Sequence, residues 1–116
     1  MSDKTATEAA TAKTVDWFMV DLTDLLMAVA EATRVPVREM KSTRRPRGTS
    51  RAREIFAHLA RVELKASYSE IGRALNKHHT SAIHAARSGE RASRIDSTTK
   101  RILEVVYASL TNERRS

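Results

Sequence analysis

The chain has 116 residues, no cysteine and a formal net charge of +7, with 41% hydrophobic and 30% charged residues. This length suits one globular domain with a modest core, and the lack of cysteine excludes a disulfide framework and thiolate metal sites.

The charge is unevenly distributed along the chain. Residues 1–40 hold 4 basic and 7 acidic side chains, a net of −3, whereas residues 41–116 hold 17 and 7, a net of +10. A segregated positive charge is what binding to nucleic acid needs, because neutralised phosphates release condensed counterions. General solubility of a basic protein is the alternative. We expect double-stranded DNA as the partner.

The two ends of the chain are polar. Residues 1–14 contain no large apolar side chain after Met1, so we expect a disordered tail there, a folded domain over residues 15–112 and a short tail over 113–116. No export signal is visible, and three aspartates interrupt the densest apolar run, Val15–Ala30. We therefore expect no membrane association and a cytoplasmic, nucleoid-associated protein.

The first expected helix covers Asp16–Thr33, because apolar residues recur there at spacings of three and four. These residues are Leu22, Leu25, Leu26, Val29 and Thr33. Core formation is the expected use of this acidic helix, and binding a protein partner is the alternative. Trp17 is expected to anchor the core. Pro36 then opens a second, short helix with the sequence PVREMKS.

Residues 41–53 form a basic stretch in which Pro46 and Gly48 break regular structure. Its arginines are Arg44, Arg45, Arg47, Arg51 and Arg53. Such a run is either a solvated surface or a loop that follows DNA phosphates and inserts an arginine into a narrow minor groove.

A central core helix is expected over Arg51–Leu64, capped by Thr49 or Ser50. The side chains expected on its buried face are Ala52, Ile55, Phe56, Leu59 and Val62. His58 on this helix is expected to be an ordinary boundary residue.

Residues 67–87 have the pattern of a helix-turn-helix. Ser67 and Glu70 form a capping-box pattern that starts a helix at Tyr68, and Asn76 with Lys77 forms a polar break. The second helix is expected to begin near His78 or His79 and to end at Gly89. Gly72 lowers the intrinsic stability of the first helix. A close approach between helices at this position would explain why a glycine is there.

The second helix has two distinct faces when residues are placed 100° apart. One face carries Ala82, Ile83 and Ala86, and the other carries Ser81, His84, Ala85 and Ser88, with Thr80 and Arg87 at the edge. Small, polar side chains suit a helix that lies in the major groove and contacts base edges. His79 falls nearer the inner face, as a first-turn DNA contact or a buried cap.

The last helix is expected over Arg94–Leu110, with a cap at Asp96 or Ser97, closing the bundle over the core. Its apolar residues are Ile95, Ile102, Leu103, Val106 and Leu110. The pattern as a whole predicts an all-α fold, a compact bundle of about five to six helices.

Enzymatic chemistry finds little support in the sequence. The four histidines include no HExxH pattern, the acidic residues are scattered, and the three glycines are too far apart for a phosphate-cradling loop. We expect no catalytic residue, cofactor, metal or small-molecule substrate.

Three motifs in order resemble the C-terminal DNA-binding domain of the bacterial replication initiator DnaA, which has a fold like that of Trp repressor. They are Arg44-Arg45 followed by Arg51-Ala52-Arg53, then Tyr68-Ser69-Glu70-Ile71-Gly72, then His79-Thr80-Ser81-Ala82-Ile83-His84-Ala85. The resemblance covers about residues 21–110 and implies a monomer that binds an asymmetric duplex site. A dimer formed through the last helix or the acidic first helix is the alternative.

The resemblance also implies site residues. It places Arg45 in the minor groove and the start of the second helix on bases in the major groove. With the helix face above, the expected base contacts are His79, Thr80, Ser81, His84 and Arg45. The expected contacts to the DNA backbone are Arg44, Arg47, Arg53, Arg61, Ser67, Lys77, His78 and Arg87.

This sequence also departs from the family pattern. The turn Asn76-Lys77-His78 is one residue short and lacks the family's Arg and Asp, Ser69 replaces a proline, and Ser81 replaces a threonine. We expect a stand-alone DNA-binding domain without ATPase activity, a small replication or transcription regulator of phage or mobile-element type. The alternatives are a protein-interaction module that uses the acidic helix and a sequence-neutral nucleic-acid coat, for which stacking aromatics are few.

Overall fold

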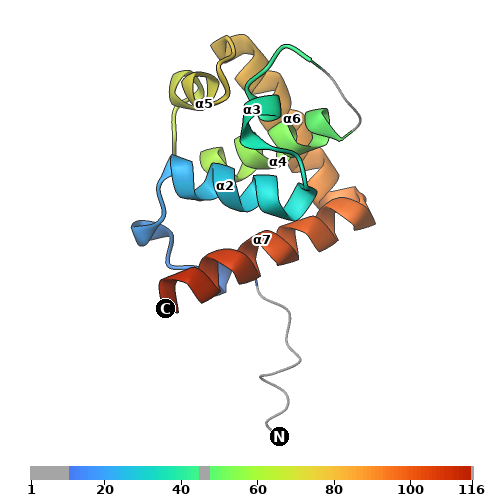
Figure 1. The fold of residues 1–116 in the computed structure, drawn as a ribbon. Coiled ribbons are helices and arrows are strands. Elements are labelled where there is room, and N and C mark those ends of the chain that lie inside the picture. The colour runs from blue at the N-terminus through green and yellow to red at the C-terminus, as the bar shows by residue number, and fades with distance from the viewer. Residues whose placement is uncertain (1–10, 45–47, 116) are drawn as a thin grey trace, which may run out of the picture.

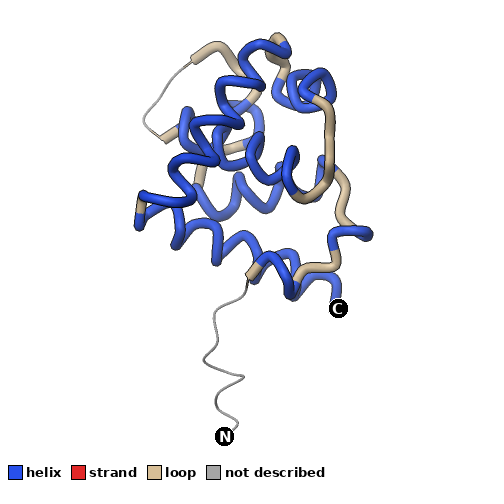
Figure 2. The backbone as a smooth tube through the Cα atoms, turned by 180° about the vertical axis from the view of Figure 1, so that it is seen from behind, coloured by secondary structure: helices blue, strands red, loops and turns tan. Residues whose placement is uncertain are grey.

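The computed structural model describes residues 11–44 and 48–115, with side chains described up to Thr111. Two 3-10 turns, η1 (Ala12–Thr14) and η2 (Trp17–Met19), precede the helices. The helices are α2 (Leu22–Thr33), α3 (Val37–Met40), α4 (Thr49–Val62), α5 (Tyr68–Leu75), α6 (His79–Ile95) and α7 (Ser97–Arg115). The described residues contain no strand (Figures 1 and 2), which confirms the expected all-α bundle.

The first helix starts later than the expected Asp16. Asp21 Oδ1 accepts a hydrogen bond from the Asp24 N–H at 2.8 Å, and Asp24 Oδ2 accepts one from the Asp21 N–H at 3.1 Å. This reciprocal cap fixes the start of α2 at Leu22, because it satisfies N–H groups that have no partner within the helix. The residues before it form η2 instead.

The described residues nearest the two ends of the chain have regular structure. Residues 1–10 lie outside the described residues, but Thr11 caps η1, and the Thr111 hydroxyl donates to the Thr14 carbonyl at 3.3 Å. The expected disorder is therefore wrong for residues 11–14. Helix α7 continues to Arg115, so the expected C-terminal tail is also helical up to that residue.

Helix α4 begins without the expected side-chain cap. Its N-cap is Gly48 with φ 89°, a left-handed conformation that glycine adopts at little cost. Thr49 is the first helical residue and is fully buried, and its Oγ1 has no hydrogen-bond partner among the described residues. The prediction of a cap at Thr49 or Ser50 is wrong.

Helix α6 was expected to end at Gly89, but it continues to Ile95. Gly89 lies where α6 crosses α4, and a Cβ atom there would be 2.1 Å from the Glu54 carbonyl oxygen. The glycine therefore permits a close helix crossing instead of terminating a helix. Asp96 ends α6 and caps α7, because its Oδ2 accepts from the Thr99 N–H at 2.9 Å, so α7 starts at Ser97 and not at Arg94.

Helix α4 is the centre of the core and packs most extensively on α6, while α7 crosses α2 on the opposite side (Figure 1). The core faces follow the predicted patterns with two exceptions. Val62 is 44% exposed and Ile95 is 72% exposed, because each lies where its helix ends. Trp17 is half-buried against the core and meets Tyr107 edge-on, with ring centroids 6.3 Å apart, as expected of an anchor.

The apolar stripe of α2 is committed to this core. Leu25, Leu26 and Val29 are buried, which confirms the expected core role of the acidic helix. In the stretches 11–44 and 48–115, no helix has the length and hydropathy needed to cross a membrane.

Candidate nucleic-acid interface

The two helices expected from the helix-turn-helix pattern are α5 and α6. The Ser67 Oγ accepts from the Glu70 N–H at 3.0 Å, and the Glu70 Oε1 accepts from the Ser67 N–H at 2.8 Å. This confirms the predicted capping box. Helix α5 ends with Asn76 in the left-handed region at φ 58°, a conformation that asparagine tolerates better than most residues.

Gly72 explains how a short turn can join the two helices. The Lys77 N–H donates to the Gly72 carbonyl at 2.7 Å, and a Cβ atom on residue 72 would be 2.7 Å from the Lys77 carbonyl oxygen. The close approach expected at this glycine therefore exists, but it is to the backbone of the turn. Only a residue without a side chain fits between α5 and residues 76–78 in this arrangement.

The N-cap of α6 is His78. Its Nδ1 accepts from the Thr80 N–H at 3.2 Å and lies 3.0 Å from the Thr80 hydroxyl oxygen. An imidazole that accepts on Nδ1 and is neutral carries its proton on Nε2. His79 is exposed and stacks on His78 with ring centroids 4.3 Å apart, so its expected inner position is wrong.

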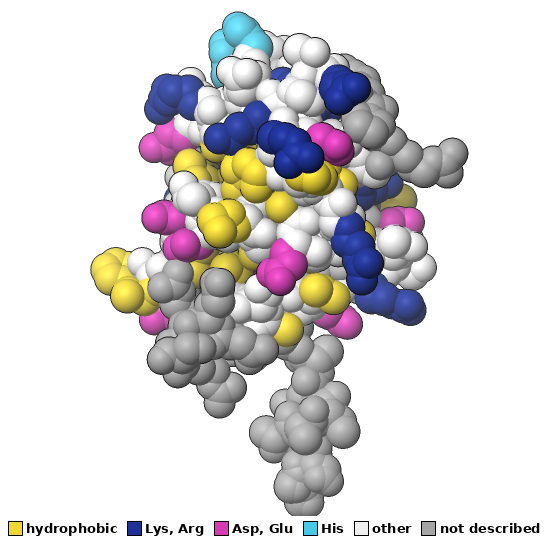
Figure 3. Space-filling view, in the orientation of Figure 1, with side chains coloured by type: hydrophobic (Ala, Val, Ile, Leu, Met, Phe, Trp, Pro, Cys, Tyr) yellow, Lys and Arg dark blue, Asp and Glu magenta, His cyan; other side chains and the backbone are white. Residues whose placement is uncertain are grey.

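The first turns of α6 present a polar face to solvent. Thr80, Ser81, His84 and Arg87 are exposed, whereas Ala82, Ala86 and Gly89 are buried. This division follows the predicted helix faces. In Figure 3 histidine side chains lie at the top of the molecule with Lys and Arg side chains below them. The small side chains leave a shallow hollow of about 290 Å³ between α6 and the start of α4.

Arg53 has a different role from the expected phosphate contact. The side chain is buried, with 9% of its surface exposed. Its Nε donates to the Met40 carbonyl at 2.7 Å, and its Nη2 lies at 3.0 Å from the Glu39, 2.7 Å from the Ser42 and 3.1 Å from the Arg44 carbonyl oxygens. The guanidinium therefore fixes the backbone of residues 39–44, which include the start of the basic stretch. Burial and these contacts to carbonyls give Arg53 an anchoring role that the sequence did not predict.

Lys77 attaches the same backbone to the helix-turn-helix. Its Nζ donates to the Ser42 carbonyl, which also accepts from Arg53. One carbonyl of the basic stretch is thus shared by a residue of α4 and a residue of the turn. The position of residues 39–44 relative to the start of α6 is therefore fixed from two sides.

Arg61 supports the connection between α4 and α5. Its Nη1 donates to the Ala66 carbonyl at 3.1 Å, and its guanidinium lies 4.3 Å from the centroid of the Tyr68 ring. The side chain remains exposed. This arrangement braces the first helix of the motif and keeps a positive charge at the surface beside it.

The structure leaves most of the expected site residues exposed, but it does not test their contacts with DNA. Exposed residues of the expected set are Arg44, Arg61, Ser67, His78, His79, Thr80, Ser81, His84 and Arg87, and Lys77 is half-buried. Arg45 and Arg47 lie outside the described residues. The two roles that the sequence did not reveal are the cap by His78 and the anchoring by Arg53.

Titratable side chains cluster at the seam between α4 and α6, behind this surface. Burial lowers the pKa of His58, and the nearby Glu90 carboxylate partly opposes that shift. Burial raises the pKa of Glu54, which Arg51 partly opposes from 3.1 Å. The described residues contain no group of three or more His, Cys, Asp or Glu side chains arranged to hold a metal ion.

The family model described as the bacterial dnaA protein helix-turn-helix matches residues 22–88. The chain is similar to the chromosomal replication initiator protein DnaA of Methylobacillus flagellatus, with 32% identity over 88 residues, which cover 75% of this chain and 19% of that protein. It is also similar to the chromosomal replication initiator protein DnaA of Aquifex aeolicus, with 37% identity over 83 residues, 71% of this chain and 21% of that protein. The chain thus spans about a fifth of the length of these relatives.

Proposed function

The chain belongs to the bacterial DnaA helix-turn-helix family, and from that premise we propose that it binds specific sites in double-stranded DNA. In this proposal α6 lies in the major groove, and residues 41–48 of the basic stretch follow the adjacent minor groove. The observation that carries the proposal is the exposed polar face at the start of α6. It stands next to a basic segment whose backbone is fixed to the same motif.

The proposed base contacts come from the start of α6. Thr80 and Ser81 are exposed hydroxyls in the first turn, and His84 lies one turn further on the same face. Hydroxyl and imidazole groups can donate to or accept from base edges, and small neighbours allow a close approach. His79 reaches beyond the helix end. Arg45 is the proposed minor-groove side chain, as the family resemblance implies.

The proposed phosphate contacts surround this face. Arg44, Arg61 and Arg87 are exposed cations on three different elements, so they can meet the backbone on both sides of the major groove. Ser67 and His78 lie at the N-termini of α5 and α6, where partial positive charge favours phosphate. Lys77 and Arg47 complete the proposed set. Such contacts position the protein and make its affinity depend on salt.

The biological role that we propose is regulation of replication or transcription by a monomer bound to the nucleoid. A phage or mobile-element origin fits a DNA-binding module of this kind.

Selection from a pool of random duplexes tests the proposal, followed by affinity measurements at several salt concentrations. Thr80→Ala should lose about 1 to 3 kcal/mol of discrimination at one base pair of the enriched site. Arg47→Ala should weaken binding to all sequences and reduce the salt slope by about one. Arg101→Ala, an exposed cation on α7, is the matched control and should change neither property. If no sequence is enriched and Arg45→Ala leaves the affinity unchanged, specific reading of DNA is refuted.

A second candidate function is binding of a replication or transcription partner through the acidic N-terminal region. The observation that favours it is Phe18, whose side chain is 94% exposed just before α2. The apolar stripe of α2 is buried in the core, so a partner would bind the surface next to the helix. This function can be tested by comparing single-molecule footprints of the chain on DNA in the presence and absence of a candidate replication protein. A partner bound to the chain would enlarge its footprint.

A further inference from the structure

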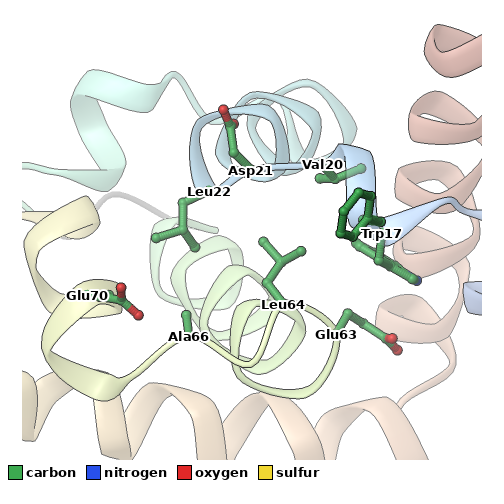
Figure 4. A pocket seen from close by; sticks show the side chains of 9 residues that line it. Trp17, Val20, Asp21, Leu22, Glu63, Leu64, Ala66 and Glu70 are labelled. Carbon is green, nitrogen blue, oxygen red and sulfur yellow. The ribbon is translucent and has the colours of Figure 1, made fainter.

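An acidic groove lies beside the start of α2, on the flank of α5. It has a volume of about 530 Å³ and is lined on one side by residues 17–22 and on the other by the α4–α5 connection and α5. Figure 4 shows Leu22 and Leu64 directed into the same space, with Glu70 at one end and Glu63 at the other. The middle of the groove is therefore apolar and its ends are charged.

Large apolar side chains continue the groove at the surface. Phe18 is 94% exposed and Met19 is 54% exposed. Trp17 supports this segment from inside, because its Nε1 donates to the Ala12 carbonyl at 2.8 Å. An exposed apolar patch with a polar rim is typical of an interaction site, whereas isolated exposed apolar residues are ordinary. Here the patch is contiguous with a hollow that could receive a side chain.

The charge of the groove is negative. Its carboxylates are Asp21, Glu63 and Glu70, and none of the described residues that line it is Lys or Arg. The capping boxes hold Asp21 and Glu70 in place. Lys65, next to the groove, turns its Nζ to the Val62 carbonyl at 3.0 Å. Burial raises the pKa of Glu63, and the nearby Lys65 cation only partly opposes this shift, so a further cation from a partner would stabilise the charged carboxylate.

We propose that this groove docks a protein partner through a cationic amphipathic segment. An aliphatic or aromatic side chain of the partner would enter beside Leu22 and Leu64, cover Phe18, and place Lys or Arg side chains opposite Glu63 and Glu70. Three carboxylates repel DNA phosphates, so the groove does not itself bind DNA. It adjoins the proposed phosphate contacts Arg61 and Ser67, which are hydrogen-bonded to its lining residues, and it contains none of the proposed base contacts on α6. The inference rests on the second candidate function and is independent of DNA recognition.

A second copy of the chain is a less suitable occupant. Most of the chain's own basic residues belong to residues 41–116, and those in the basic stretch and beside the start of α6 are the ones proposed to contact DNA. A copy that used them in the groove of its neighbour would give up its DNA surface. A foreign cationic segment has no such conflict.

Peptide display on the full chain tests the proposal. A random dodecapeptide library is selected on the immobilised protein, and the most enriched sequence is synthesised and titrated by fluorescence anisotropy. We expect enriched peptides that combine Lys or Arg with a large apolar residue. NMR shifts on binding should map to residues 18–22 and 63–70, and not to the start of α6.

Two variants that spare the core sharpen the test. Phe18→Ser and Glu63→Lys alter an exposed and a half-buried side chain outside the α-helices, so both should keep the melting temperature of the wild type. Each should weaken the peptide at least about tenfold. Met27→Ser removes another exposed apolar side chain, 58% exposed on α2, and should leave the peptide affinity unchanged. All three should bind the selected duplex as the wild type does.

Several results would overturn the inference. Enrichment of acidic or neutral peptides would remove the charge argument, and unchanged affinity in Phe18→Ser and Glu63→Lys would remove the groove. If Met27→Ser loses affinity for the peptide and the NMR shifts fall on α2, the protein binds a partner through another surface and the groove is refuted. A dimer in sedimentation that Phe18→Ser dissociates would assign the groove to a second copy. If the wild-type protein binds the peptide but no DNA duplex, only the DNA proposal is refuted.

Discussion

Replacing Gly89 with alanine tests how closely α4 and α6 cross. The added Cβ would lie 2.1 Å from the Glu54 carbonyl oxygen, 2.7 Å from the Glu54 carbonyl carbon and 2.9 Å from the His58 Cβ. These are backbone or Cβ atoms, so no change of side-chain rotamer can relieve the contact. Ordinary van der Waals contacts begin near 3.4 Å, and the helices must therefore separate by more than about 1 Å at this point.

Two opposing effects set the size of the loss. Alanine is favoured over glycine within a helix by about 1 kcal/mol. Overpacking a well-packed core typically costs about 1 to 3 kcal/mol and sometimes more. The contact at 2.1 Å involves rigid backbone in the most extensive helix pair, which places this site at the upper end. We expect Gly89→Ala to lower the free energy of unfolding by roughly 2 kcal/mol.

Urea denaturation followed by circular dichroism measures this change. The loss should appear as a lower midpoint with an unchanged slope, since the slope reports the surface exposed on unfolding. In a thermal scan, about 2 kcal/mol corresponds to a melting temperature lower by roughly 10 °C in a domain of this size. Arg91→Ala is the control, an exposed position two residues further along α6 that should stay within about 0.5 kcal/mol of the wild type.

A Gly89→Ala variant as stable as the wild type, or more stable, would refute this reasoning. It would mean that the two helices do not meet at Gly89 and that the residue only weakens α6. A stable variant with reduced DNA affinity would instead indicate that the helices had shifted without unfolding.

Three further changes probe the site and its support. Arg53→Met should lower the free energy of unfolding by about 3 kcal/mol, since it leaves the carbonyls of residues 39–44 without their charged donor. It should also lower the affinity for the selected duplex. A loss of DNA affinity without a loss of stability would contradict the anchoring role. Gly72→Ala should cost about 1 to 3 kcal/mol by urea denaturation, because its Cβ would lie 2.7 Å from the Lys77 carbonyl oxygen, while Ser69→Ala, exposed on the same helix, should stay near the wild type. The pKa of His58 is lowered in the folded state, so the unfolded chain takes up the proton more readily, and stability should fall as the pH drops below about 6.5. Urea midpoints at neutral and mildly acidic pH should show a smaller drop for His58→Gln than for the wild type, and equal drops would show that His58 has no part in the pH dependence.

The features that could be predicted from the sequence are those that depend on nearby residues. The capping box at Ser67 and Glu70, the turn at Asn76 and the buried face of α4 follow from residues a few positions apart, and the structure confirms them. Family membership could also be inferred from three ordered motifs, and the comparisons support it.

The misjudged helix end at Gly89 and the unpredicted role of Arg53 share a physical cause, which is contact between segments far apart in the chain. Gly89 looked like a helix end because its partner, the Glu54 carbonyl, is 35 positions away. Arg53 looked like a free cation because its acceptors are carbonyls, which every residue has and no side-chain pattern reveals. The start of α2 was misjudged for a local reason, since apolar residues at Trp17–Val20 masked the capping aspartates.

The carbonyl of Ser42, held by both Arg53 and Lys77, bears on the length of the DNA site. A stretch tied at that point to the turn before α6 cannot slide along the duplex independently of the helix. The protein would then measure a fixed number of base pairs between its minor-groove and major-groove contacts. Inserting a single base pair between the two halves of a target should abolish recognition, although every contacted base is still present. The attachment at Ser42 would thus set the spacing between the two contacts.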